Sequence, residues 1–103
     1  MKIVIDASDV LRLEDAESFN QFKIIAPAAL LGSEHLAQQI GVLGKMDENG
    51  NHAWVSISKF LTLFGSDRSD TWRESFSNMI ESAAKYGFLN ADRNAFRSHI
   101  DLL

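Results

Sequence analysis

The sequence predicts a single domain of the α+β class. From Thr71 to about Tyr86, apolar residues recur at the spacing of one helix face. From Phe96 to Leu102 they alternate with polar residues, as in a strand with one buried face. The chain has 103 residues, of which 46% are hydrophobic. This length and composition fit one compact domain with its own core.

The N-terminal residues 1–26 are predicted to form a strand-containing extension. Lys2 to Ile5 is a short apolar run that ends at D-A-S-D, which is typical of a strand followed by a turn. Two interpretations fit the residues that follow. Asp15 suits the cap of a short helix, and F-K-I-I-A at 22–26 reads equally well as a second strand.

Residues 27–103 are predicted to hold the main domain, which begins with a helix. Pro27 suits the first turn of a helix, where a missing N–H costs nothing. A break at Gly32 with a new cap at Ser33 is one possible division, and Gly44 is a plausible end. The apolar residues at helical spacing in this stretch are Leu30, Leu36, Ala37, Ile40 and Leu43.

A turn, a short strand and a short helix are predicted next. Asn49-Gly50 is a strong turn dipeptide, and H-A-W-V-S at 52–56 follows as a strand. Ser56 or Ser58 is expected to cap a two-turn helix that ends at Gly65.

The long helix and a C-terminal hairpin complete the prediction. Thr71 and Glu74 fit the T-x-x-E capping box, and Gly87 fits the left-handed position after the last turn. A-D-R-N-A at 91–95 suits a hairpin tip before the alternating strand. The expected buried face of the helix consists of Trp72, Phe76, Met79, Ile80 and Ala83.

This order of elements resembles the winged helix-turn-helix superfamily over about residues 27–103. The resemblance rests on H-A-W-V-S-I-S-K-F-L-T-L-F and on K-Y-G-F-L-N-A-D-R-N-A-F-R-S-H-I, the second of which is similar to a MarR-type helix and wing. It implies a non-enzymatic protein that binds double-stranded DNA in transcriptional control, as a homodimer. The nucleic-acid-binding residues expected from it are Arg68, Arg73, Ser77, Asn78, Lys85, Arg93 and Arg97.

The charge distribution keeps a second interpretation open, a winged-helix module for protein–protein interaction or dimerisation without DNA binding. Residues 1–50 contain four Lys/Arg and eight Asp/Glu, whereas residues 51–103 contain six of each. Phosphate neutralisation supplies most non-specific affinity for nucleic acid, and an acidic half does not favour it. Glu74 and Glu81 also offset the basic residues on the long helix.

A metal-dependent nuclease is a distant third hypothesis. A strand that ends at Asp6 could present carboxylates to a divalent cation, with Asp9, Glu14 and Asp15 nearby. A turn made by Asp and Ser at the strand end explains these residues better, and His35, His52 and His99 lack the spacing of a metal site. We therefore expect no cofactor or metal. Trp54 and Trp72 are expected in the core more than around a ligand.

The remaining composition points to a cytoplasmic protein without a membrane anchor. There is no cysteine, so disulfides and Cys-based zinc sites are excluded. No apolar run approaches the roughly 18 residues of a membrane span. The first apolar run is interrupted at Asp6 and is too short for a signal peptide.

Overall fold

A mixed six-stranded β-sheet forms the centre of the domain, as the computed structural model shows for residues 1–48 and 50–103. The strand order is β2-β1-β3-β6-β5-β4. β1, β3 and β6 run parallel, and the pairs β1–β2, β6–β5 and β5–β4 are antiparallel. The strands are β1 (Lys2–Val4), β2 (Arg12–Glu14), β3 (Lys23–Ala26), β4 (Gly44–Met46), β5 (His52–Ser56) and β6 (Ala95–Leu102).

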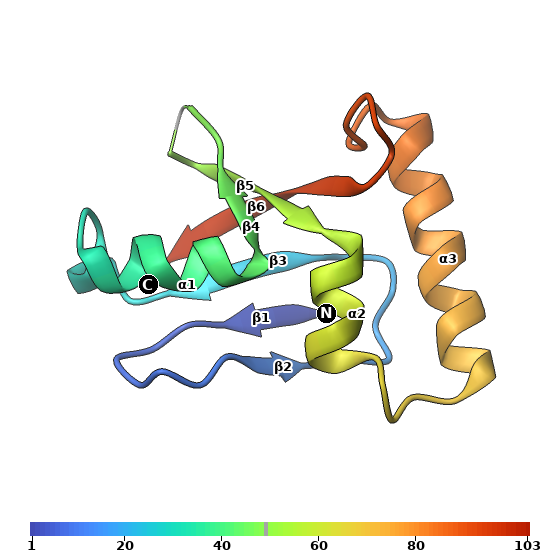
Figure 1. The fold of residues 1–103 in the computed structure, drawn as a ribbon, viewed down its shortest axis with the longest axis horizontal. Helices are drawn as coiled ribbons and strands as arrows, with labels where there is room; N and C mark the ends of the chain where they lie inside the picture. Colours follow the sequence, from blue (N-terminus) through green and yellow to red (C-terminus); the bar gives the residue numbers. More distant parts are fainter. Residues whose placement is uncertain (49) are drawn as a thin grey trace.

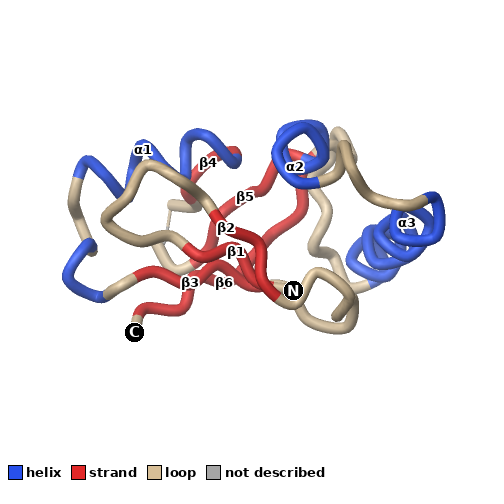
Figure 2. Tube along the Cα trace, turned by 90° about the horizontal axis from the view of Figure 1, so that it is seen from below, coloured by secondary structure: helices blue, strands red, loops and turns tan. Residues whose placement is uncertain are grey.

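Three α-helices and one 3-10 turn accompany the sheet within the described residues. α1 and α2 lie on one side of the sheet, and α3 lies beyond one end of it (Figure 1, Figure 2). The compact α+β class is therefore confirmed. The helical elements are η1 (Ala28–Leu30), α1 (Glu34–Leu43), α2 (Ile57–Phe64) and α3 (Asp70–Lys85).

A serine caps each α-helix at its first turn. The Ser33 and Ser56 hydroxyls accept from the N–H groups of the third residues along, which confirms both predicted caps. The cap of α3 was predicted two residues too late. Ser69, rather than Thr71, accepts from the Trp72 N–H at 3.1 Å, because the helix already begins at Asp70. Pro27 precedes only the short turn η1, so the α-helix does not start there; the predicted break at Gly32, cap at Ser33 and end at Gly44 are confirmed.

The N-terminal residues 1–26 are integrated into the sheet and the core. β1 lies between β2 and β3, and Ile3 and Ile24 are fully buried. The strand interpretation of 22–26 is confirmed over Lys23–Ala26. The alternative helix capped by Asp15 does not form, because Asp15 adopts a left-handed φ of 53° in a turn.

α3 ends before Gly87 as predicted, but the strand that follows pairs with other strands than the prediction expected. Gly87 has φ 77°, and the Phe88 N–H donates to the Ala83 carbonyl at 2.9 Å, the bond of a left-handed helix end. The expected hairpin is reduced to one bridge between Leu89 and Phe96. β6 pairs instead with β3 and β5. The prediction of a separate two-stranded hairpin at the C-terminus is therefore corrected.

The turn before β5 is only partly described. Gly50 has φ 73°, which suits the predicted turn, whereas Asn49 lies outside the described residues.

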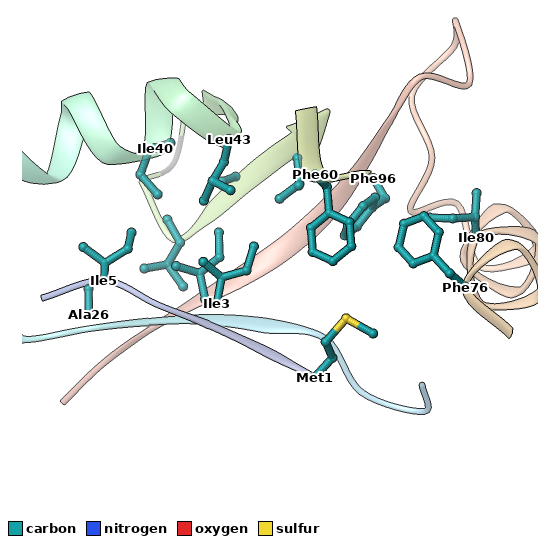
Figure 3. Packing of buried hydrophobic residues seen from close by; sticks show 14 of the residues in the cluster. Met1, Ile3, Ile5, Ala26, Ile40, Leu43, Phe60, Phe76, Ile80 and Phe96 are labelled. Atoms are coloured by element: carbon teal, nitrogen blue, oxygen red, sulfur yellow. The ribbon is translucent and has the colours of Figure 1, made fainter. Parts of the chain in front are cut away.

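One hydrophobic core joins the sheet to all three α-helices (Figure 3). Ile40 and Leu43 of α1 cover one half of the sheet. At the other end, Phe60 of α2 stacks on Phe76 of α3 at 5.1 Å between ring centroids with 8° between the planes. Trp72 stacks on Phe76 in turn, at 5.4 Å and 5°. This aromatic stack attaches α3 to the domain.

Candidate ligand pocket

A cavity of about 470 Å³ lies between α3, the loop at 15–22 and the strands β5 and β6. Volumes of this size are typical of small-molecule sites. Its apolar walls come from three separate parts of the chain. They are formed mainly by Phe19, Phe22, Met79, Ile80, Phe88 and Phe96.

Strand pairing brings His52, His99 and Arg97 together on one wall of the pocket. His52 and His99 are directly opposite in the β5–β6 ladder, so both side chains lie on the same face, with ring centroids 5.3 Å apart. Arg97 is two residues before His99 on β6 and therefore shares that face. Three nitrogen-rich side chains thus border a largely apolar cavity, whose other polar lining residues are Asn20, Gln21 and Ser82.

Arg97 links this histidine pair to a carboxylate. Its Nη2 lies 3.3 Å from Nδ1 of His52 and 3.3 Å from Oδ2 of Asp47. Its Nε is buried and has no hydrogen-bond partner among the described residues. A buried charged donor left unpaired is rare in proteins, and such groups occur often at functional sites.

The pKa of His52 is lowered from the ordinary value of an imidazole. Burial of the ring is the largest cause, followed by the positive charge of Arg97 and the neighbouring His99, and Asp47 opposes them. The ring is therefore neutral near pH 7. When Arg97 donates to Nδ1, that nitrogen is the acceptor and Nε2 carries the proton.

The loop that closes the pocket is held at several points. The Trp72 indole N–H donates to the Ala16 carbonyl at 2.8 Å, and Phe19 packs edge-on against Trp72 at 5.8 Å. The N-terminal ammonium of Met1 donates to the carbonyls of Ser18 and Gln21, each at 2.8 Å. Hydrogen bonds as well as packing thus hold this loop in place against the pocket.

Two aromatic rings lie at the rim. Tyr86 is 76% exposed and Phe88 is 45% exposed, with their ring centroids 6.3 Å apart. Both line the pocket, so its entrance is apolar next to the polar wall of the strands.

The predicted nucleic-acid residues do not form one cluster. The Arg68 Nε–H donates to the Phe64 carbonyl at 3.0 Å, and its guanidinium lies over the Trp72 ring. Arg73 Nη2 donates to the Gly65 carbonyl at 2.9 Å. Both arginines thus stabilise the connection between α2 and α3.

The other predicted residues are divided between α3, the turn before β6 and the pocket. Ser77, Asn78 and Lys85 are exposed on α3. Arg93 lies at the turn and pairs with Glu81 of α3 at 3.3 Å. Only Arg97 is brought to the pocket, beside two histidines that the site prediction did not include.

The acidic residues of the nuclease hypothesis are occupied by local contacts. Asp6 accepts from the Ser8 N–H at 2.8 Å and from Arg12 at 3.0 Å. Asp15 pairs with Lys2 at 3.2 Å. Within residues 1–48 and 50–103, no group of three His, Cys, Asp or Glu side chains is arranged to hold a metal ion.

Comparison of the chain with protein-family models, with curated proteins and with solved structures gave no match. In the part of the chain that the structure describes, no helix has both the length and the apolar character needed to cross a membrane.

Proposed function

We propose that this protein is a binding domain for small amphipathic anions, molecules with an apolar or aromatic body and one anionic group. The supporting observation is the 470 Å³ apolar cavity with Arg97, His52 and His99 together on one wall. Pockets that combine apolar walls with a few polar groups and a shifted pKa are the usual form of ligand sites.

The two parts of the ligand have different binding sites in this proposal. The apolar body lies among the phenylalanine and methionine side chains, where burial of apolar surface stabilises it. The anionic group accepts hydrogen bonds from Arg97 and from the histidines. Arg97 is already paired with Asp47, so protonation of His52 adds the positive charge that the anion needs.

A matched pair of fluorescent probes tests the proposal. 8-Anilinonaphthalene-1-sulfonate carries a sulfonate, and N-phenyl-1-naphthylamine has the same ring skeleton without it. We expect both to bind, and the sulfonate to bind more tightly as the pH falls below about 6.5, because the His52 imidazole, whose pKa is lowered, then becomes charged. The affinity of the neutral probe should change little.

Three substitutions assign the binding to this pocket. Arg97→Gln should weaken the sulfonate about tenfold or more, as expected for loss of a charged hydrogen-bond donor, while the neutral probe is retained. Ala83→Leu places extra volume in the pocket and should weaken both probes. Ala84→Leu, one residue further along α3, is the matched control, because Ala84 is not part of the pocket lining.

Two outcomes would refute the proposal. One is equal affinity for the charged and neutral probes in wild type and in Arg97→Gln. The other is equal binding in Ala83→Leu and Ala84→Leu. Circular dichroism of each variant checks that a loss of binding is not a loss of fold, since the sulfonate probe also binds partly unfolded proteins.

Duplex DNA binding through α3, the function that the winged-helix resemblance implies, stays a prediction. It is supported by the exposed polar side chains of Ser77, Asn78 and Lys85. A gel-shift titration at low salt with wild type and Lys85→Gln tests it. Absence of binding at micromolar protein would refute it. Sedimentation of the protein alone tests the predicted homodimer.

A further inference from the structure

A second hollow, of about 430 Å³, lies at the β4 edge of the sheet. Its volume falls within the range of about 300–1,000 Å³ that is usual for small-molecule sites. β4, β5, the first turn of α2 and the turn before β6 form its walls, and its described lining residues do not overlap with those of the ligand pocket. The side chains that determine its chemistry are Lys45, Trp54, Ser56, Ser58, Asn90 and Asn94.

Trp54 is the one aromatic side chain among the described residues that line this hollow. Its neighbours in β5, Ala53 and Val55, are buried on the face that α1 and α2 cover, so half-buried Trp54 lies on the opposite face (Figure 2). Trp72, by contrast, stacks in the core and donates its indole N–H to the Ala16 carbonyl. Within residues 1–48 and 50–103, the Trp54 ring has no stacked ring, no overlying cation and no acceptor for its indole N–H. Its flat face is therefore accessible to a ligand.

Polar groups beside this ring are held in place by hydrogen bonds. Asn90 Oδ1 accepts from the Asn94 N–H at 2.9 Å, and Asn90 Nδ2 donates to Asn94 Oδ1 at 2.7 Å. The Asn94 carbonyl accepts from the Ile57 N–H at 2.9 Å, which attaches this turn to α2. These bonds leave both hydrogens of Asn94 Nδ2 without a partner among the described residues. The Ser56 and Ser58 hydroxyls, 3.2 Å apart, add further donors and acceptors.

The charges around the hollow favour a neutral ligand. Trp54 is directly opposite Lys45 on β4 and Arg97 on β6, so a cation on its ring would meet two positive charges. Of the described lining residues, only Lys45 is charged, and Arg97 beside it is paired with Asp47. A polyanion would therefore find a single positive charge here, whereas its binding depends on neutralising several negative ones.

We propose that this hollow binds a neutral saccharide, with one face of a pyranose ring on Trp54 and its hydroxyl groups on Asn94 and the two serines. The C–H groups on the flat face of a sugar carry partial positive charge, which the negative face of an indole attracts. Sugar hydroxyls both donate and accept, as do the amide and hydroxyl groups of the rim. Trp54 is the one ring described here, so the other face of the ligand stays in water, which suits a sugar better than an aromatic base.

The two tryptophans supply the measurement and its internal control. In ¹H–¹⁵N spectra each indole N–H gives one signal. A neutral tetrasaccharide, tested as cellotetraose, maltotetraose and chitotetraose, should shift the Trp54 signal and leave that of buried Trp72 in place. Sorbitol has the hydroxyl groups without a rigid ring and should shift neither signal. The 8-anilinonaphthalene-1-sulfonate probe should remain bound, because the site is separate from the ligand pocket.

Substitutions at the ring and at the rim assign the binding to this hollow. Trp54→Ala, followed by backbone amide signals of the turn at 90–95, should weaken binding about tenfold or more, and Trp54→Phe should weaken it less. Asn94→Asp retains the oxygen that accepts from Asn90 but removes both amide donors, so it should weaken binding about twofold to tenfold. Asn78→Asp makes the same change on the exposed side of α3 and should leave the affinity unchanged. An unchanged Trp72 signal shows that each variant is folded.

Four results would overturn the proposal. One is the absence of a Trp54 shift with all three tetrasaccharides at about 10 mM, a concentration that detects millimolar affinity. Another is an equal shift with sorbitol, which would show an effect without ring recognition. Equal affinity of wild type, Trp54→Ala and Asn94→Asp would place the sugar elsewhere. Tighter binding of adenosine than of any saccharide would identify a site for an aromatic base. Each of these results leaves the test of the small-anion pocket unaffected.

Discussion

Removal of the Phe76 ring should strongly destabilise the domain, because this ring connects α3 to the rest of the structure. Phe76 is 3% exposed and stacks on both Phe60 and Trp72, whose own ring centroids are 6.4 Å apart. Truncation of a buried phenylalanine to alanine costs about 3–5 kcal/mol in the free energy of unfolding. A domain of ordinary stability has about 5–15 kcal/mol in total, so Phe76→Ala removes a large part of it.

Phe76→Leu distinguishes the contribution of ring stacking to stability from the contribution of filling the core. Leucine retains most of the apolar contact but loses both stacked pairs, each of which contributes about 0.5–1.5 kcal/mol beyond buried area. The expected loss is therefore about 1–3 kcal/mol. Ser77→Ala, the next residue and exposed, is the control and should change stability by less than about 0.5 kcal/mol.

Urea unfolding followed by circular dichroism and by tryptophan fluorescence measures these differences. With a denaturant dependence of about 1.5 kcal/mol per molar urea, Phe76→Ala should lower the midpoint by about 2–3 M. The two signals should change together in wild type. A loss below about 1 kcal/mol for Phe76→Ala would refute the conclusion that the aromatic stack attaches α3.

Four further substitutions test three backbone positions and the histidine in the pocket wall. Gly44→Ala should destabilise strongly, because a Cβ there would collide with the Trp54 carbonyl oxygen, whereas Gly41→Ala in open space on α1 should stabilise by about 0.5–1 kcal/mol in thermal melts. Gly87→Ala should cost about 1 kcal/mol in urea, since φ is 77°. Stability should fall as the pH decreases below about 6.5, because folded His52 has a lowered pKa and binds fewer protons than the unfolded chain. His52→Gln should make this fall less steep.

The local elements with strong patterns were predictable from the sequence. The stripe of α3 identified Trp72, Phe76 and Ile80 as buried residues, and the alternation near the C-terminus identified Phe96 and Ile100. These predictions succeeded because each periodic pattern reports directly which side of an element is apolar. The strands β2 and β4 have three residues each, too few to show any period.

Strand pairing was the part that the sequence did not reveal. The pattern of β6 indicates a strand with one buried face, but not that its neighbours are β3 and β5. The sequence analysis therefore treated His52 and His99 as separate residues, although the register places them opposite each other across 46 intervening residues. The one available signal was that both lie on the polar side of an alternating run. For the same reason Arg97 was assigned to a wing rather than to a pocket wall.

The central place of β6 affects the order in which the domain can assemble during synthesis. β6 is made after all other strands, yet it connects the β2-β1-β3 half of the sheet to the β5-β4 half. Until it emerges from the ribosome, β3 and β5 each present an unpaired edge, the kind of edge that joins other chains. Long-range parallel pairing is also slow to form. The nascent chain therefore depends on rapid completion of β6, or on a chaperone that covers these two edges, to avoid aggregation.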